Sequence, residues 1–272
     1  MTKNVLYIIK ILYNYKSIVI EEVDFLIKLY ADYHTHTIYS HGKGTIMDNV
    51  MAARSKGLTE IAITDHGIRH LTFGVKKKNI AIMRDEVDRI NERCDGIKVL
   101  LGMECNIISS EGDIDMNDEI RKYLDILLVG YHMMVAPASF QDAWNIYGLN
   151  YMDKFFSYNT EKVKEKNTLS MEKAIKKNKI DIITHPGARI SIDTAYIAQV
   201  AVKAGTALEI NSHSSAMTAE HVKAAAKYGV KFVIDSDAHK PEDVGRLDNG
   251  LKIALDAGLD SSQIINAVKQ SI

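Results

Sequence analysis

This 272-residue sequence has few of the features that mark secreted or membrane proteins. It contains only two cysteines, Cys94 and Cys105, and three prolines. Two cysteines cannot build the disulfide framework of a small secreted domain, so a reducing, cytoplasmic location is expected. No apolar run approaches the roughly 20 residues that cross a bilayer, so we expect no membrane partner.

The sequence also lacks an excess of charge of one sign. It has 34 Lys and Arg against 35 Asp and Glu, a formal net charge of -1. Proteins that coat nucleic acid normally carry a basic excess, so no long nucleic-acid partner is expected. The composition, 46% hydrophobic and 25% charged, is that of an ordinary globular protein. Whether the chain forms a homo-oligomer is left open by the sequence.

The N-terminal residues stand apart from the rest. Residues 1–20 are apolar and tyrosine-rich, but Lys10 interrupts them and no small-residue cleavage site follows, which argues against a signal peptide. One interpretation is an added amphipathic helix or docking tail. Another is a mis-annotated start, in which Glu21-Glu22-Val23 is translated from a purine-rich ribosome-binding sequence. We therefore predict an N-terminal extension over 1–26 and one folded domain over 27–272.

Short apolar segments alternate with amphipathic helical ones through the rest of the chain. The apolar segments lie at 25–30, 58–64, 97–103, 125–130, 180–184, 207–210 and 231–234. Strands alternating with helices indicate a parallel sheet, and seven such units without a Pro-, Gly- or Ser-rich linker predict an α/β barrel. A loop with one or two helices is expected over 133–178, and one or two further helices at the C-terminus.

Polar residues cluster where these predicted strands end. In a strand–helix barrel the C-terminal strand ends and the loops after them meet on one face, where such barrels build their sites. The clustered residues are His34, His36, His41, His66, Glu104, His132, His185, Asp237 and His239.

This set of side chains favours a metal centre. Seven converging imidazoles would repel one another if protonated and would lack acceptors if neutral, and divalent ions resolve both problems. Imidazoles with two carboxylates suit zinc, manganese or iron better than magnesium or calcium. Nine ligands exceed the needs of one ion, so we predict two or three divalent metal ions. Such ions attract anions and lower the pKa of bound water, which fits hydrolysis of a phosphate ester.

Six motifs, read in order, resemble the motif series of a known family. They are HTH (34–36), ITDHG (63–67), GMEC (102–105), GYH (130–132), THPG (184–187) and SDAH (236–239). The series is similar to that of the PHP, or polymerase and histidinol phosphatase, superfamily of metal-dependent phosphoesterases. The resemblance implies a distorted (β/α)7 barrel, and it is greatest to single-domain bacterial phosphatases that hold three metal ions.

The resemblance also implies how the ligands are shared. The first ion would be held by His34, His36, Glu104 and Asp237. Glu104 would bridge to a second ion, which His132 and His185 complete. The third ion would bind His41, His66 and His239. His41 follows His36 one position sooner than is common in the related phosphatases, so the third site departs most from the family pattern.

Further roles are expected for residues near these motifs. We expect the catalytic residues to be Glu104, Asp237, His239 and Arg189. Arg189 follows a metal motif and carries the side chain best suited to bidentate phosphate binding, with Arg69 and Arg246 as alternatives. By strand alternation Asp65 should point away from His66 and support the site.

Two further residues are expected to have no role in catalysis or metal binding. Cys105 should face the opposite side of its strand from Glu104 and pack in the core. His70 should be exposed and without a role.

The primary prediction is hydrolysis of phosphate monoesters of small metabolites, by a metal-bound hydroxide that attacks phosphorus in line. Three alternatives remain open. One is a phosphodiesterase or exonuclease-like hydrolase of nucleotides or short oligonucleotides, and another is a histidinol phosphatase. A third is a non-enzymatic, metal-binding regulatory module. Such a module would be expected to have lost one or two ligands, and none is missing from this sequence.

Overall fold

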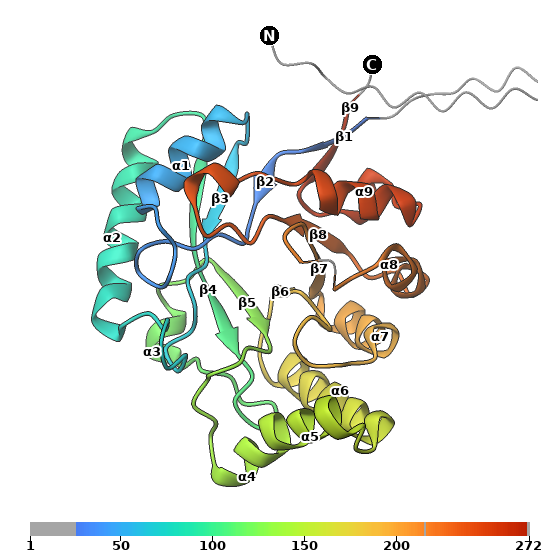
Figure 1. Ribbon diagram of the computed structural model, residues 1–272. Coiled ribbons are helices and arrows are strands. Elements are labelled where there is room, and N and C mark those ends of the chain that lie inside the picture. Colours follow the sequence, from blue (N-terminus) through green and yellow to red (C-terminus); the bar gives the residue numbers. More distant parts are fainter. Residues whose placement is uncertain (1–25, 215, 271–272) are drawn as a thin grey trace, which may run out of the picture.

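The structure, a computed structural model, describes residues 26–214 and 216–270. Its centre is a seven-stranded parallel sheet that curls into a barrel (Figure 1). The strands lie side by side in their sequence order. They are β2 (Ala31–Asp32), β3 (Glu60–Ile63), β4 (Lys98–Asn106), β5 (Ile126–Gly130), β6 (Ile182–Ile183), β7 (Ala207–Asn211) and β8 (Phe232–Asp235).

One isolated β-bridge closes the barrel between its first and last strands. Thr35, just beyond β2, forms an isolated parallel bridge with Ala238, just beyond β8. The amide of His36 donates to the carbonyl of Ala238 at 2.8 Å, and the amide of Ala238 donates to the carbonyl of His34 at 3.2 Å. The distorted (β/α)7 barrel expected from the sequence is therefore confirmed.

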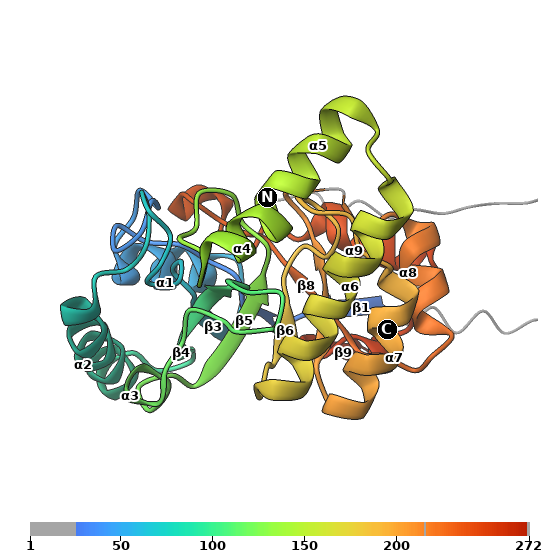
Figure 2. The ribbon, with the colours of Figure 1, turned by 90° about the horizontal axis from the view of Figure 1, so that it is seen from below.

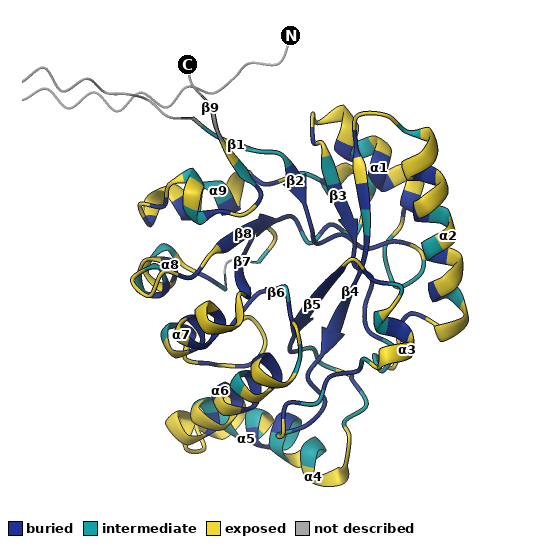
Figure 3. Cartoon of the chain, turned by 180° about the vertical axis from the view of Figure 1, so that it is seen from behind, coloured by how far each residue is buried: buried dark blue, intermediate teal, exposed yellow. Residues whose placement is uncertain are grey.

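Helices surround the barrel and expose their outer faces (Figure 3). They are α1 (Ile46–Ser55), α2 (Lys77–Arg93), α3 (Asp118–Arg121), α4 (Phe140–Asp142), the π-helical η1 (Ala143–Gly148), α5 (Leu149–Phe156), α6 (Thr160–Lys177), α7 (Thr194–Ala204), α8 (Ala219–Ala226), the short 3-10 turns η2 (Pro241–Asp243) and η3 (Ser261–Gln263), and α9 (Asp248–Asp256). Thr45 begins α1 with a capping box to Asp48, because its hydroxyl satisfies an amide that the helix leaves free.

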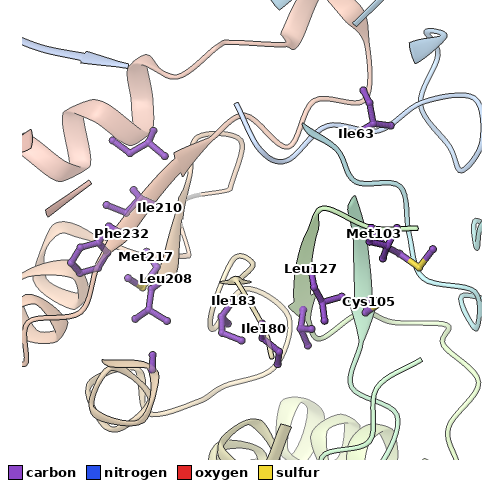
Figure 4. Close-up of a cluster of buried hydrophobic side chains, with 14 of the residues drawn as sticks. Ile63, Met103, Cys105, Leu127, Ile180, Ile183, Leu208, Ile210, Met217 and Phe232 are labelled. Carbon is purple, nitrogen blue, oxygen red and sulfur yellow. The ribbon is translucent and has the colours of Figure 1, made fainter. Parts of the chain in front are cut away.

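Side-chain alternation along the strands produces two apolar layers. Outward-facing residues such as Leu127 and Phe232 pack between the sheet and the helices (Figure 4). Inward-facing residues such as Leu128 and Val233 fill the barrel. Cys105 belongs to the outer layer, as predicted, so its neighbour Glu104 points into the barrel.

One expectation, at the N-terminal end of the domain, was wrong. The segment predicted as the first barrel strand is β1 (Leu26–Leu29), which pairs antiparallel with β9 (Ala267–Gln270) in a separate two-stranded sheet. The physical reason lies in Lys28, which is exposed, because a barrel strand must be buried on both faces. The first barrel strand is β2 instead. The helix expected near the C-terminus is present as α9, and the strand β9 that follows it was not predicted.

The predicted extension over 1–26 falls almost entirely outside the described residues, which begin at residue 26. Its helix, tail and start-site interpretations therefore stay predictions. Among the residues that are described, none of the helices has the length and apolar character needed to cross a membrane.

Candidate metal centre

The structure brings all nine predicted ligands together at the C-terminal end of the barrel. Their donor atoms include three groups, and within each group all the atoms lie within 4.8 Å of one another. The groups are His36, His41, His66 and His239; His34, His36 and Glu104; and His66, Glu104 and His132. His185 joins them through its Nε2, which lies 3.2 Å from Nε2 of His132.

The carboxylate of Glu104 lies at the middle of the cluster. Its Oε1 is 2.9 Å from Nε2 of His185, 3.0 Å from Nε2 of His132 and 3.2 Å from Nε2 of His34. Its Oε2 is 2.9 Å from Nδ1 of His66 and 3.6 Å from Nε2 of His36. Burial favours the neutral acid, but the imidazoles of His132 and His34 outweigh it and hold the pKa of Glu104 well below its usual range. Glu104 is therefore ionised.

Asp237 supplies the second carboxylate from the loop after β8. Its Oδ1 lies 3.3 Å from Nε2 of His36 and 3.5 Å from Nε2 of His34. Asp237 has φ +53° and His185 has φ +29°, both in the left-handed region that non-glycine residues rarely adopt. Such strain persists only where the surroundings enforce it, and it is concentrated at functional sites.

The short spacing between His36 and His41 does not keep His41 out of the cluster. Its ring centroid lies 4.0 Å from that of His239 and 4.8 Å from that of His66. Asp65 shapes the loop that carries it, accepting bonds from the Thr37 amide at 2.7 Å and the Thr37 and Ser40 hydroxyls at 2.5 Å. Asp65 thus holds the loop that carries His41 and is not itself one of the ligands, as its position in the sequence predicted.

Three imidazoles are oriented by partners at Nδ1. His34 Nδ1 lies 2.6 Å from Oε1 of Glu209, and His132 Nδ1 lies 2.7 Å from Oδ1 of Asn106. His239 Nδ1 lies 2.8 Å from the carbonyl oxygen of Asp237. An acceptor at Nδ1 fixes the proton there and leaves Nε2 free as a ligand atom. Burial lowers the pKa of His132 to about 4. For His34, the carboxylates of Glu104 and Glu209 outweigh burial and raise the pKa well above its usual value.

Several buried polar atoms of the cluster have no hydrogen-bond partner within the described chain. They are Glu104 Oε2 and the Nδ1 atoms of His36, His41 and His66. His66 Nδ1 and Glu104 Oε2 lie 2.9 Å apart, but without the angles of a hydrogen bond. An unsatisfied buried polar atom costs about 1–3 kcal/mol, so four in one cluster are expected only where another group completes them. The donor set fits divalent transition-metal ions.

Two supporting residues escaped the sequence reasoning. Glu209, in the predicted strand ALEI, is completely buried beside His34, and Asn106 lies beside His132. A signal was present for Glu209, because strand alternation places it on the inward side, where an isolated carboxylate needs a partner. Asn106 gave no comparable signal, since β4 was expected to end before it.

The predicted phosphate-binding arginines differ in their surroundings. Arg189 is exposed on the loop after β6, four residues beyond His185, and both line one small pocket. The guanidinium of Arg69 donates to the carbonyl of Pro137 at 2.7 Å. That of Arg246 pairs with Asp243 at 2.6 Å. Arg189 thus remains the leading candidate among the three.

The expectation that His70 is exposed was wrong. It is partly buried, and its ring stacks on that of His66, with centroids 4.9 Å apart. Its Nδ1 accepts from the amide of Phe73 at 3.2 Å, so the turn over 70–73 folds the ring back over the site.

Comparisons with known proteins agree with this geometry. The family model described as the PHP domain matches residues 32–249. A probable phosphatase from Thermoanaerobacter sp. (strain X514) is 32% identical over 255 residues, which cover 88% of this chain and 91% of that protein. A probable phosphatase from Shewanella sp. (strain MR-4) is 32% identical over 251 residues, covering 87% of this chain and 86% of that protein.

Solved structures are similar in fold. The histidinol phosphate phosphatase of Lactococcus lactis, crystallised with zinc, L-histidinol and phosphate, superposes with a TM-score of 0.60 at 15% identity. The match covers 85% of this chain and 94% of that one. A histidinol phosphatase described as putative from Listeria monocytogenes gives a TM-score of 0.58 at 16% identity, covering 79% and 97%.

Proposed function

Because the chain belongs to the PHP domain family, we propose that it is a metal-dependent hydrolase of phosphate monoesters of small metabolites. The observation that carries the proposal is the buried Glu104 carboxylate, which faces five imidazoles while its Oε2 lacks a hydrogen-bond partner in the described chain. The relatives named probable phosphatases support the same class of reaction.

The proposed ligand sets follow the distances in the cluster. A first ion would be held by His34, His36, Glu104 and Asp237. The Nε2 atoms of the two histidines lie 3.2–3.6 Å from the nearest oxygens of the two carboxylates. A second would be held by Glu104, His132 and His185. A third would be held by His41, His66 and His239, with His36 alongside. Zinc, manganese and iron suit all three donor sets.

When bound, such ions lower the pKa of water to around 7 and neutralise the charge of a phosphate. The chain's own contribution is to hold the donors in place. Glu209 and Asn106 keep the Nε2 atoms of His34 and His132 turned toward Glu104. Arg189, exposed on the loop four residues beyond His185, would bind the phosphoryl oxygens of the substrate.

Two features favour a small monoester over the alternatives. The formal charge of -1 offers no basic track for a long polynucleotide, which favours a small substrate over nucleic acid. The intact set of nine ligands favours a working centre over a regulatory module that has lost part of one.

The experiment compares hydrolysis of p-nitrophenyl phosphate and bis-p-nitrophenyl phosphate by the purified protein, with and without chelator. We expect chelator-sensitive hydrolysis, faster on the monoester than on the diester. The Glu104→Gln variant should lose at least about 100-fold in turnover, because the isosteric amide cannot balance the positive charge of the ions. Glu92→Gln, on the exposed face of α2, is the matched control. Faster cleavage of the diester, or full activity of Glu104→Gln, would contradict the proposal.

A further inference from the structure

The segment from 151 to 160 leaves the body of the barrel. α5 and the turn that follows it project from the rest of the molecule (Figure 2). None of these ten residues is buried, and Tyr151, Phe155, Phe156 and Tyr158 are exposed. Monomeric soluble proteins rarely expose aromatic side chains in such a group unless the surface binds something.

The aromatic side chains extend back along the preceding helical turns. We call the group the aromatic hairpin surface. It consists of Phe140 (98% exposed), Trp144 (55%), Tyr151 (48%), Phe155 (68%), Phe156 (74%) and Tyr158 (52%). The rings of Tyr151 and Phe155 stack in parallel, with centroids 6.3 Å apart.

Polar contacts brace this projection against the barrel. The side-chain amides of Asn150 and Asn167 bond to each other in both directions, at 2.9 and 3.0 Å. Asn167 also donates to the carbonyl of Ser191 at 3.0 Å. At the tip, the hydroxyl of Thr160 donates to Asp153 at 2.7 Å. The aromatic side chains are therefore presented on a braced element, which reduces the ordering cost of binding a partner.

The turn at the tip has an unusual backbone. Ser157 and Asn159, on either side of Tyr158, have φ +51° and +54°. Ser157 ends α5 in the left-handed conformation common at helix C-termini, and Asn159 is a residue type that adopts this region more readily than most. The turn sets the direction of α5 relative to α6.

We propose that the aromatic hairpin surface binds the same surface of a second copy of this chain, to form a two-fold symmetric dimer. An aromatic side chain buries about 150–250 Å², so the exposed fractions of these six sum to at most roughly 800 Å² per copy. That is the area each partner contributes to a stable interface of standard size. Tyrosine, tryptophan and phenylalanine are also the side chains enriched at the centres of interfaces.

Charge favours a second copy over a membrane. Residues 140–158, which carry the aromatic hairpin surface, contain two aspartates and one lysine. A surface with both signs of charge can pair with itself across a two-fold axis, because Lys154 can face Asp142 or Asp153 of the other copy. A helix that binds an anionic membrane surface carries a basic excess, which this stretch lacks.

Sedimentation velocity on the full-length protein, from about 1 to 100 μM, tests the proposal. The wild-type protein should sediment as a dimer, and the double variant Phe155→Ser/Phe156→Ser should weaken the dimer at least about 30-fold. Tyr228→Ser, an exposed aromatic on the turn after α8, is the matched control and should leave the dimer unchanged. Phosphatase activity should be retained in both variants. A monomeric wild type, or a dimer that survives the double variant, would overturn the proposal.

Two further measurements test whether the surface contacts a second copy directly and whether it binds a membrane. Phe156→Cys should form a disulfide-linked dimer on mild oxidation, whereas Tyr228→Cys should not, and mass spectrometry of peptides identifies the linkage. Co-sedimentation with vesicles of neutral and anionic phospholipid should recover no protein with the lipid. Binding to vesicles that the double variant abolishes would assign the surface to a membrane and overturn the dimer.

Discussion

The carboxylate of Glu209 lies 2.6 Å from Nδ1 of His34, and both side chains are fully buried. Its second oxygen accepts from the backbone amide of His185 at 2.5 Å and from the side chain of Asn211 at 3.1 Å. One carboxylate on β7 thus connects the ends of β2 and β6, where two of the proposed ligands lie. Glu209 holds the geometry of the site without facing the Glu104 carboxylate.

Replacing Glu209 with glutamine tests this supporting role. The amide keeps the size of the side chain but removes the charge that favours the His34 tautomer with its proton on Nδ1. Loss of such a partner typically lowers metal affinity or activity about 10–100-fold. We expect that decrease in zinc affinity, measured by competition with a chelating dye, with secondary structure unchanged. Glu220→Gln on the exposed face of α8 is the control. Wild-type affinity in Glu209→Gln would show that His34 needs no such partner.

Asp65 should govern the third ion alone. Its carboxylate accepts three bonds from Thr37 and Ser40, and these shape the loop that brings His41 to the cluster. In Asp65→Asn the amide nitrogen cannot accept, so the loop should lose part of this support. We expect the metal content per chain to fall by one ion, as in His41→Ala. If His41→Ala loses an ion and Asp65→Asn does not, the loop does not depend on Asp65.

Arg189 should act on substrate binding and not on metal binding. A charge-assisted hydrogen bond contributes about 1.5–3 kcal/mol, so Arg189→Ala should raise KM for p-nitrophenyl phosphate about 10–100-fold. Inhibition by inorganic phosphate should weaken by a similar factor, while metal content stays the same. Arg246→Ala, which removes a guanidinium paired with Asp243, is the matched control. An unchanged KM in Arg189→Ala would remove this residue from the phosphate-binding group.

Much of the site was predictable because its residues lie at the ends of strands. Strand alternation and the barrel's single functional face are enough to bring His66 near Glu104, although the two are far apart in the sequence. The structure places them at 2.9 Å. The inward direction of Glu104 and the outward direction of Cys105 follow from the same alternation.

What could not be predicted depends on contacts between distant segments. Nothing local in LIKL shows that β1 pairs with β9, because the partner strand lies at the other end of the chain. His70 looked idle because only the turn over 70–73 and its bond to Phe73 bring the ring back over His66. Asn106 became visible only when β4 proved to run two residues beyond Glu104.

The most direct test of the central claim is metal analysis by mass spectrometry on protein purified without chelator, with p-nitrophenyl phosphate turnover on the same sample. We predict close to three transition-metal ions per chain, and turnover that a chelator abolishes and added manganese or zinc restores. Two ions would remove the third site, formed by His41, His66 and His239, and leave a two-ion centre. Protein without metal, and without activity after manganese or zinc is added, would contradict the account.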